Sequence, residues 1–358
     1  MVEKLSRNER FRGVILGTAV GDALGLPAEG ISRRRAKKLF KGRWRHRLVI
    51  NRGMVSDDTD HTVFVAQSLL AHPDSSGLFT RRLSWCLRWW ILSVPAGVGL
   101  ATLKSILRLW VGISPSRSGV YSAGNGPAMR SAPIGAFFAF APDLLDGYLQ
   151  ASTKITHTDP RALIGAKAVA YLTALSIRED STERPSLEKF SKVLQSANNQ
   201  DEDWDNLVTL ISAAYRQRQS VDQFAESLGL FKGITGYVYH TVPVAVYAWY
   251  KHFGDFEQTV SAVLNCGGDT DTTGAIAGAL AGAVVGEMGI PGDWLKGIFD
   301  WPRGPKQLRK IADLLAQKSQ QPTATSPVRY FWPGLVLRNA FFLSVVLLHG
   351  FRRLAPPY

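Results

Sequence analysis

Two acidic clusters, far apart in the chain, combine carboxylates with hydroxyls at close spacing. Residues 56–60 read Ser-Asp-Asp-Thr-Asp, and residues 269–273 read Asp-Thr-Asp-Thr-Thr. Carboxylate and hydroxyl oxygens are hard ligands that suit Mg²⁺, Mn²⁺ or Ca²⁺. Such crowding of acids is unexpected in a chain whose formal net charge is +13. The two clusters would form a site for a pair of metal ions if the fold brings them together.

The first cluster also has a purely structural interpretation, whereas the second favours function. Ser56 is a good helix N-cap, and acids in a first turn complement the helix dipole, so residues 56–60 could be an ordinary helix start. Two glycines at 267–268 permit a tight turn before the second cluster. Asp269 and Asp271 alternate, so both can point to one side of an extended approach.

A glycine-rich segment and a histidine-containing segment could contact a ligand. Residues 122–130 read Ser-Ala-Gly-Asn-Gly-Pro-Ala-Met-Arg. The backbone N–H groups of such a turn could cradle phosphate, with Arg130 adding charge, although Gly-Asn-Gly also makes an ordinary turn. His157 could contact a ligand or satisfy a loop. The neighbouring Asp159-Pro160 pair is typical of a helix start.

Residues 13–29 predict a helix that packs closely against another element. Its glycines recur at a spacing of three to four residues, which favours close packing. Pro27 ends the helix, and Glu29 follows, where a carboxylate can reach into a cleft. By itself the position of Glu29 favours a structural role over a functional one.

The elements that must position these residues are predicted to be helices. Strand patterns with hairpin turns are scarce, so we expect an all-α globule of many packed helices. Apolar residues at helical spacing or in buried-helix runs mark the segments 14–24, 63–70, 83–92, 100–110, 134–140, 164–175, 204–215, 242–249 and 272–285.

Composition and charge narrow the class of protein. The 358 residues are 46% hydrophobic and 20% charged, a globular balance. Cys86 and Cys266 imply no disulfide framework, and the polar N-terminus is no secretory signal, so we expect a cytoplasmic protein, with membrane association through its C-terminal tail as an alternative. We also expect a monomer. The basic stretch at residues 33–47 could bind a polyanion or be a solvated surface loop. Nucleic acid is weakly supported, because only Phe40 and Trp44 offer stacking partners there.

The C-terminal region is expected to be separate from the main domain. Residues 178–206 resemble a surface excursion around one helix, and residues 320–327 a linker. Beyond the linker, an apolar run is broken by Arg338 and ends before Arg352 and Arg353. It could be a helix docked on the core, a helix on a membrane surface, or a span, for which it is short. We therefore divide the chain into a domain at 8–318 and a linker with tail helix at 319–358.

Together and in this order, four motifs resemble those of the ADP-ribosylglycohydrolase family. That family includes the bacterial enzyme that removes ADP-ribose from dinitrogenase reductase, and the eukaryotic ADP-ribosylhydrolases. The resemblance spans roughly residues 8–316 and implies a compact all-α domain with a dinuclear Mg²⁺ or Mn²⁺ cleft. The motifs are Gly-Asp-Ala-Leu-Gly at 21–25, Ser-Asp-Asp-Thr at 56–59, Gly-Asn-Gly-x-Ala-Met-Arg at 124–130 and Gly-Gly-Asp-x-Asp-Thr-Thr-Gly at 267–274.

The resemblance also implies a role for each site residue. Two Mg²⁺ ions, or Mn²⁺, would be held by Ser56, Asp57, Asp58, Asp269, Asp271 and Thr272. Glu29 and Asp58 would be the catalytic carboxylates, with Glu29 positioning or deprotonating the attacking water. Asp60 and Thr273 are expected to cap or pack. ADP-ribose would contact Ser122, Gly124, Asn125, Gly126, Met129, Arg130 and His157.

The implied activity is metal-dependent hydrolysis of the C1″ glycosidic bond of ADP-ribosylated substrates, a modified protein being the expected partner. Cleavage at that carbon develops oxocarbenium character. The alternative is a catalytically silent ADP-ribose-binding module. Residues 96–100 read Ala-Gly-Val-Gly-Leu, where the dinitrogenase-reductase type has Val-Asp-Val-Gly-Asn, and Asp159 replaces a histidine. The resemblance therefore does not by itself imply the arginine-linked specificity of that type, and an arginine, serine, nucleic-acid or small-molecule linkage stays open.

Overall fold

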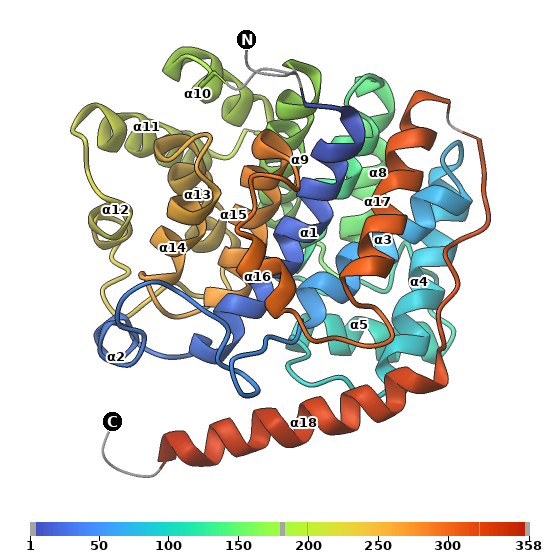
Figure 1. The fold of residues 1–358 in the computed structure, drawn as a ribbon. Coiled ribbons are helices and arrows are strands. Elements are labelled where there is room, and N and C mark those ends of the chain that lie inside the picture. Colours follow the sequence, from blue (N-terminus) through green and yellow to red (C-terminus); the bar gives the residue numbers. More distant parts are fainter. Residues whose placement is uncertain (1–4, 180–182, 199, 322, 355–358) are drawn as a thin grey trace.

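The chain folds into packed helices, as its sequence pattern predicts. A computed structural model describes residues 5–179, 183–198, 200–321 and 323–354 (Figure 1). Within these residues the only pairing between extended segments is a few isolated bridges, and no strand forms. The helices are α1 Arg7–Gly25, α2 Arg33–Leu39, α3 Asp57–Ala71, α4 Ser76–Leu92, α5 Leu100–Trp110, α6 Gly126–Met129, α7 Ala132–Phe137, α8 Pro142–Lys154, α9 Pro160–Glu179, α10 Leu187–Ser196, α11 Glu202–Arg216, α12 Val221–Ser227, α13 Val238–Lys251, α14 Phe256–Leu264, α15 Thr270–Val285, α16 Gly292–Gly297, α17 Pro305–Gln320 and α18 Pro333–Leu354, with a short 3₁₀ helix, η1, at Leu26–Ala28.

Helices α1 and α15 form the centre of the fold and run in opposite directions. Their glycines meet in pairs, because a Cβ on Gly13 would lie 1.9 Å from the carbonyl oxygen of Gly282, and one on Gly21 would lie 1.9 Å from that of Gly274. The glycine spacing in the sequence therefore serves close helix packing, as predicted. At the end of this contact, Thr270 donates a 2.8 Å hydrogen bond to the carbonyl of Gly25. The C-terminal end of α1 is thus fixed beside the N-terminal end of α15.

The basic stretch at residues 33–47 is only in part the surface loop that the sequence allowed, because residues 40–47 form a loop with several exposed cations but the first part is helical. Residues Arg33–Leu39 form α2. Arg33 is buried and pairs with Glu226 at 2.5 Å, and Arg43 pairs with Glu257 at 2.7 Å. Acids on distant helices therefore neutralise part of this charge. Local composition could not reveal those partners.

The tail contains one long helix, α18, which lies along one edge of the molecule (Figure 1). The expected linker at 320–327 leads to it, with residue 322 outside the described part of the chain. Leu335 and Phe342 on α18 are buried, and Phe342 packs in a small apolar cluster with Met54 and Ala96. The side chains of Arg352 and Arg353 lie outside the description.

Candidate active site

The two acidic clusters meet in space. The first begins α3, where Ser56 is the N-cap and accepts a hydrogen bond from the backbone N–H of Asp58 at 3.3 Å. The second begins α15. The hydroxyls of Ser56 and Thr272 both donate to the same oxygen of Asp58, each at 3.2 Å. Asp58 is therefore the direct link between the two halves.

A cleft of about 770 Å³ opens beside these clusters, within the usual size range of ligand pockets. Glu29 reaches it from the turn after η1. Many of the residues expected to bind metal or substrate line the cleft. These are Glu29, Asp57, Ser122, Gly124, Asn125, Gly126, Met129, His157, Asp269, Asp271 and Thr272. Ser56 and Asp58 are buried behind this lining.

The second cluster is held in place by backbone contacts that require glycine. Gly268 donates to the carbonyl of Ile31 at 2.8 Å, and Gly30 donates to the carbonyl of Gly268 at 2.8 Å. Gly268 has a positive φ of 83°, and a Cβ there would lie 2.0 Å from the carbonyl oxygen of Ile234. Only glycine fits this junction. The same contacts place the segment that carries Glu29 beside Asp269.

The aspartate side chains of the site have raised pKa values, because burial and the neighbouring carboxylates make each of them harder to ionise. Burial raises the pKa of Asp57, Asp58 and Asp271 well above the usual range, and repulsion from neighbouring carboxylates raises it further. Glu29 contributes to that repulsion at both Asp57 and Asp271. Burial also raises the pKa of Asp269, although hydrogen bonds, including one from Asn125 at 2.6 Å, act in the opposite direction.

This donor set fits a divalent cation. One oxygen each of Asp58 and Asp271 is buried without a hydrogen-bond partner. Among the described residues, no lysine, arginine or histidine forms a salt bridge with Asp57, Asp58, Asp269 or Asp271, although other buried acids have such partners. Within the same part of the chain, no three His, Cys, Asp or Glu side chains converge into a complete metal site by themselves. The predicted set also draws on the hydroxyls of Ser56 and Thr272, so the dinuclear centre stays a prediction.

Asp22 is a buried site residue whose role the sequence did not reveal. Both of its oxygens accept from the backbone N–H of Ser56, at 3.0 and 2.9 Å, and one also accepts from the hydroxyl of Thr59. It thereby fixes the start of α3 from outside that helix. Burial raises the pKa of Asp22 to about 7, against these hydrogen bonds. Its position within Gly-Asp-Ala-Leu-Gly was a signal, but its partners lie in a distant segment.

Arg130 does not reach the cleft, which corrects the expectation that it adds charge to a phosphate cradle. It is fully buried and donates to the Ser152 carbonyl at 2.9 Å and the Thr156 hydroxyl at 2.7 Å. That hydroxyl lies 2.8 Å from Nδ1 of His157. Arg130 therefore acts on the cleft indirectly, through the position and the charge state of His157. Burial, and then the nearby Arg130 charge, lower the pKa of His157 to about 3, so its ring is neutral.

The glycine-rich loop lies against the ring of His157. A Cβ on Gly124 would lie 2.9 Å from Nε2 of that ring, and one on Gly126 would lie 3.1 Å from Cε1. Two of its backbone donors are already used, because Gly124 donates to the Ser122 hydroxyl at 3.3 Å and Asn125 to the Gly236 carbonyl at 3.0 Å. The loop therefore has fewer N–H groups for phosphate than its composition suggests.

The ADP-ribosylglycohydrolase family matches residues 3–325, nearly the whole chain apart from α18. This chain belongs to the ADP-ribosylglycohydrolase family. It is an enzyme of the class that hydrolyses ADP-ribosyl glycosyl bonds, and its helical fold agrees with the resemblance seen in the sequence motifs.

Relatives cover most of the chain at moderate identity. An uncharacterized protein of Archaeoglobus fulgidus is 34% identical over 82% of this chain and 92% of its own length. The ADP-ribosyl-[dinitrogen reductase] glycohydrolase of Rhodospirillum rubrum is 26% identical over 81% of this chain and 90% of its own length. A solved structure titled as an ADP-ribosylglycohydrolase-related protein complex superposes with a TM-score of 0.64 at 26% identity, and covers 87% of this chain and 99% of that one.

Proposed function

We propose that this chain hydrolyses the C1″ glycosidic bond of an ADP-ribosylated protein with the help of two Mg²⁺ ions, which Mn²⁺ could replace. The observation that carries the proposal is the meeting of both acidic clusters at one cleft, where buried carboxylates have no cationic partner among the described residues. Burial of unpaired carboxylates is costly. A bound cation would offset that cost.

The chain's own residues would bind, orient and activate the reactants. The proposed metal ligands are Ser56, Asp57, Asp58, Asp269, Asp271 and Thr272. When bound, the ions would hold ribose hydroxyls and favour ionisation of a water. Glu29, at the cleft, would take a proton from the water that attacks C1″. The bond from C1″ to the modified side chain breaks, the hydroxyl of the water stays on C1″, and the side chain leaves with a proton that balances the one taken up by Glu29.

The fixed loops would place ADP-ribose for this attack. His157 is neutral and nearly buried beside Gly124 and Gly126, so it can hydrogen-bond a sugar or phosphate oxygen without adding charge. Asn125 is held by Asp269 and by the Thr241 hydroxyl at 3.0 Å. The second cluster and the substrate loop are therefore physically joined.

A protein substrate is proposed because the R. rubrum relative is named for its action on dinitrogen reductase. The linkage is a separate question. Gly97 and Leu100, which replace the Asp and the Asn of that type, line the cleft. We propose that they contact the leaving group, and therefore that the linkage is not the arginine linkage.

The test is release of ADP-ribose from arginine-, serine- and nucleic-acid-linked substrates, with and without Mg²⁺. We expect Mg²⁺-stimulated release from one linkage, loss of release in Asp269→Ala and Asp271→Ala, and little effect of Asp143→Ala, an exposed acid on α8 that does not line the cleft. Unchanged turnover in both site variants would refute the metal mechanism. Binding of ADP-ribose without hydrolysis of any linkage would instead indicate a binding module.

A further inference from the structure

Helix α18 leaves most of its large apolar residues facing outward, while Arg338 and Asn339 are buried together with Leu335, Phe342 and Val345. A surface helix of a soluble protein usually buries its apolar residues and exposes its polar ones. Leu337, Leu348 and Phe351 are 70%, 68% and 68% exposed. By length and composition Pro333–Phe351 could cross a membrane, yet only a third of it is buried in the protein. The exposed side of α18 is therefore an apolar surface without a partner among the described residues.

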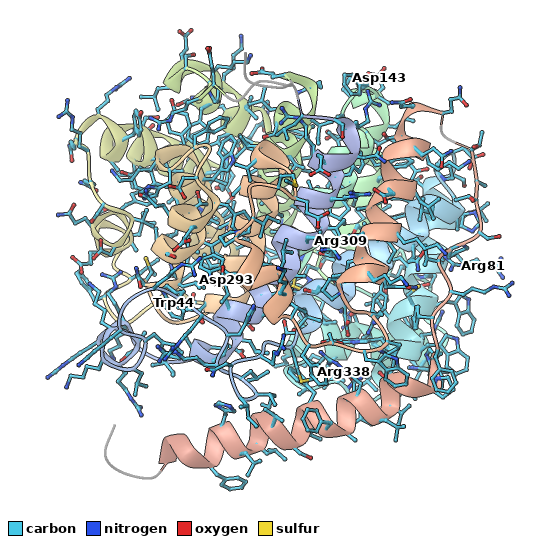
Figure 2. The ribbon with its side chains drawn as sticks, viewed as in Figure 1. Trp44, Arg81, Asp143, Asp293, Arg309 and Arg338 are labelled. Carbon is cyan, nitrogen blue, oxygen red and sulfur yellow. The ribbon has the colours of Figure 1, made fainter. Side chains whose placement is uncertain are left out.

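The inward side of α18 is fixed by polar contacts. Arg338 lies on the side of α18 that faces the protein (Figure 2). It pairs with the buried Asp300 at 2.5 Å and donates to the carbonyl of Val55 at 2.6 Å. Asn339 donates to the Ser93 carbonyl at 3.0 Å and to its hydroxyl at 2.8 Å. These contacts would leave several buried polar groups unsatisfied if α18 left the core. The helix is thus held in place with its apolar side outward.

Within Pro333–Phe351, Arg338 is the sole Asp, Glu, Lys or Arg, and it is buried on the inward side. The outward side of α18 therefore carries no such charged side chain. The one exposed hydroxyl, that of Ser344, is hydrogen-bonded to the carbonyl of Ala340 at 2.9 Å. The outward surface, made of Val336, Leu337, Phe341, Leu347, Leu348 and Phe351, therefore has no polar group that needs a protein partner.

Aromatic residues extend this surface at the N-terminal end of α18. The Trp89 ring lies 6.0 Å from that of Trp332 and 6.4 Å from that of Trp110. All three are partly exposed. Tryptophan favours the boundary between lipid headgroups and acyl chains.

Exposed cationic side chains lie near the C-terminal half of α18. His349 is 2.8 Å from the carbonyl of Leu48, which places the C-terminal half of α18 beside the turn that follows Leu48. Arg45, Arg52 and Lys296 are exposed near this turn, Arg52 donating to the Lys296 carbonyl at 2.6 Å. In the described part of the chain none of the three forms a salt bridge. Ile50, at the tip of the turn, is 93% exposed.

We propose that the outward side of α18 docks on an anionic lipid surface, lying in the plane of the membrane. Apolar side chains would enter the headgroup boundary while Arg45, Arg52 and Lys296 meet negative headgroups. The charge complementarity selects lipid over a second copy of this chain. A second copy would bring the same cations, and its net charge of +13, to a contact without compensating acids on α18.

The test is flotation of the full-length protein with vesicles. One set contains phosphatidylcholine alone, and the other phosphatidylcholine mixed with phosphatidylglycerol. We expect binding to the anionic vesicles and weaker binding at high salt. The double variant Leu337→Glu, Leu348→Glu should lower partitioning at least about tenfold, because two apolar side chains lose their burial in lipid.

Matched variants separate the surface from general changes in charge. Met288→Glu with Leu144→Glu adds the same charge at exposed apolar positions on other elements and should bind like the wild type. Arg45→Gln, Arg52→Gln and Lys296→Gln together should weaken binding to anionic vesicles. Lys192→Gln, Lys306→Gln and Lys310→Gln together should weaken it much less.

Other outcomes overturn the proposal. Wild-type protein that binds neither set of vesicles refutes it. Equal loss of binding in the Glu variants and their controls shows that net charge alone is responsible. Protein that resists extraction by alkaline carbonate would have α18 inserted as a span. A dimer in solution that the Leu337→Glu, Leu348→Glu variant dissociates would assign the surface to a second copy.

Discussion

Two neighbouring parts of the first turn of α3 carry buried aspartates that differ in their partners: one is paired with an arginine and the other has no cationic partner among the described residues. On α3, Asp60 pairs with the buried Arg303 at 2.7 Å and accepts a 2.8 Å hydrogen bond from Trp90. Two residues earlier, Asp58 has hydroxyl donors on one oxygen and no partner on the other. The same helix therefore carries one acid that the fold neutralises and one that it does not. A cation from outside the chain is the simplest reason to retain the second kind.

The contrast shows how the proposed metal ligands differ from a structural acid within one motif. Residues 56–60 contain three aspartates of equal chemistry. The fold supplies arginine to Asp60 alone, and Arg303 also lies 5.4 Å from the ring centroids of Phe64 and Tyr330. Asp60 is thus a packing residue, as expected from the sequence, and Asp57 and Asp58 are left for the cleft.

The largest expected effect is loss of stability when Asp60 is removed. Asp60→Ala leaves Arg303 buried and unpaired, which costs about 3–5 kcal/mol of unfolding free energy. Urea denaturation would measure it. The double variant Asp60→Ala, Arg303→Met should recover part of the loss, because no unpaired charge remains. A fully stable Asp60→Ala protein would contradict the comparison.

The next effect concerns the unpaired acids. Asp58→Asn and Asp271→Asn should lower ADP-ribose release at least about a hundredfold, since even residues that only orient metal ligands change activity by 10–100-fold. Their stability without metal should stay equal or rise, because repulsion between carboxylates is relieved. Activity assays and thermal unfolding on the same samples check both parts. A strongly destabilised, active Asp58→Asn protein would reverse the assignment.

The sequence could predict the helices and the two clusters because their signals are local. Apolar periodicity marked the segments at 14–24 and 100–110, and glycine spacing predicted close packing of α1. The roles of Arg33, Asp22 and Arg130 depend on partners far away in the chain. Composition suggested a charged loop and a phosphate cradle, whereas tertiary contacts determine where these side chains point.

A smaller effect is the pH dependence of the stabilisation of the protein by Mg²⁺. The pKa of Asp22 is raised from 3.8 to about 7. Between these values the unfolded chain has lost this proton and the folded chain keeps it, so the unfolding free energy of the metal-free protein falls as pH rises. Mg²⁺ binds ionised carboxylates. We expect its rise in Tm to be at least about 2 °C larger at pH 8 than at pH 5, and nearly absent at both in Asp271→Asn.

The smallest predicted effect concerns substrate placement by paired residues beside the cleft. The Thr156 hydroxyl joins the buried Arg130 to His157. Thr156→Val keeps the shape and removes this link, so KM should rise about tenfold with kcat little changed, the value of one lost hydrogen bond. Ser118→Ala, which removes a 2.8 Å hydrogen bond to the nearby Ile155 carbonyl, is the matched control. Equal KM changes in both would mean that the loop needs general rigidity and that the orientation of His157 has no separate part in binding.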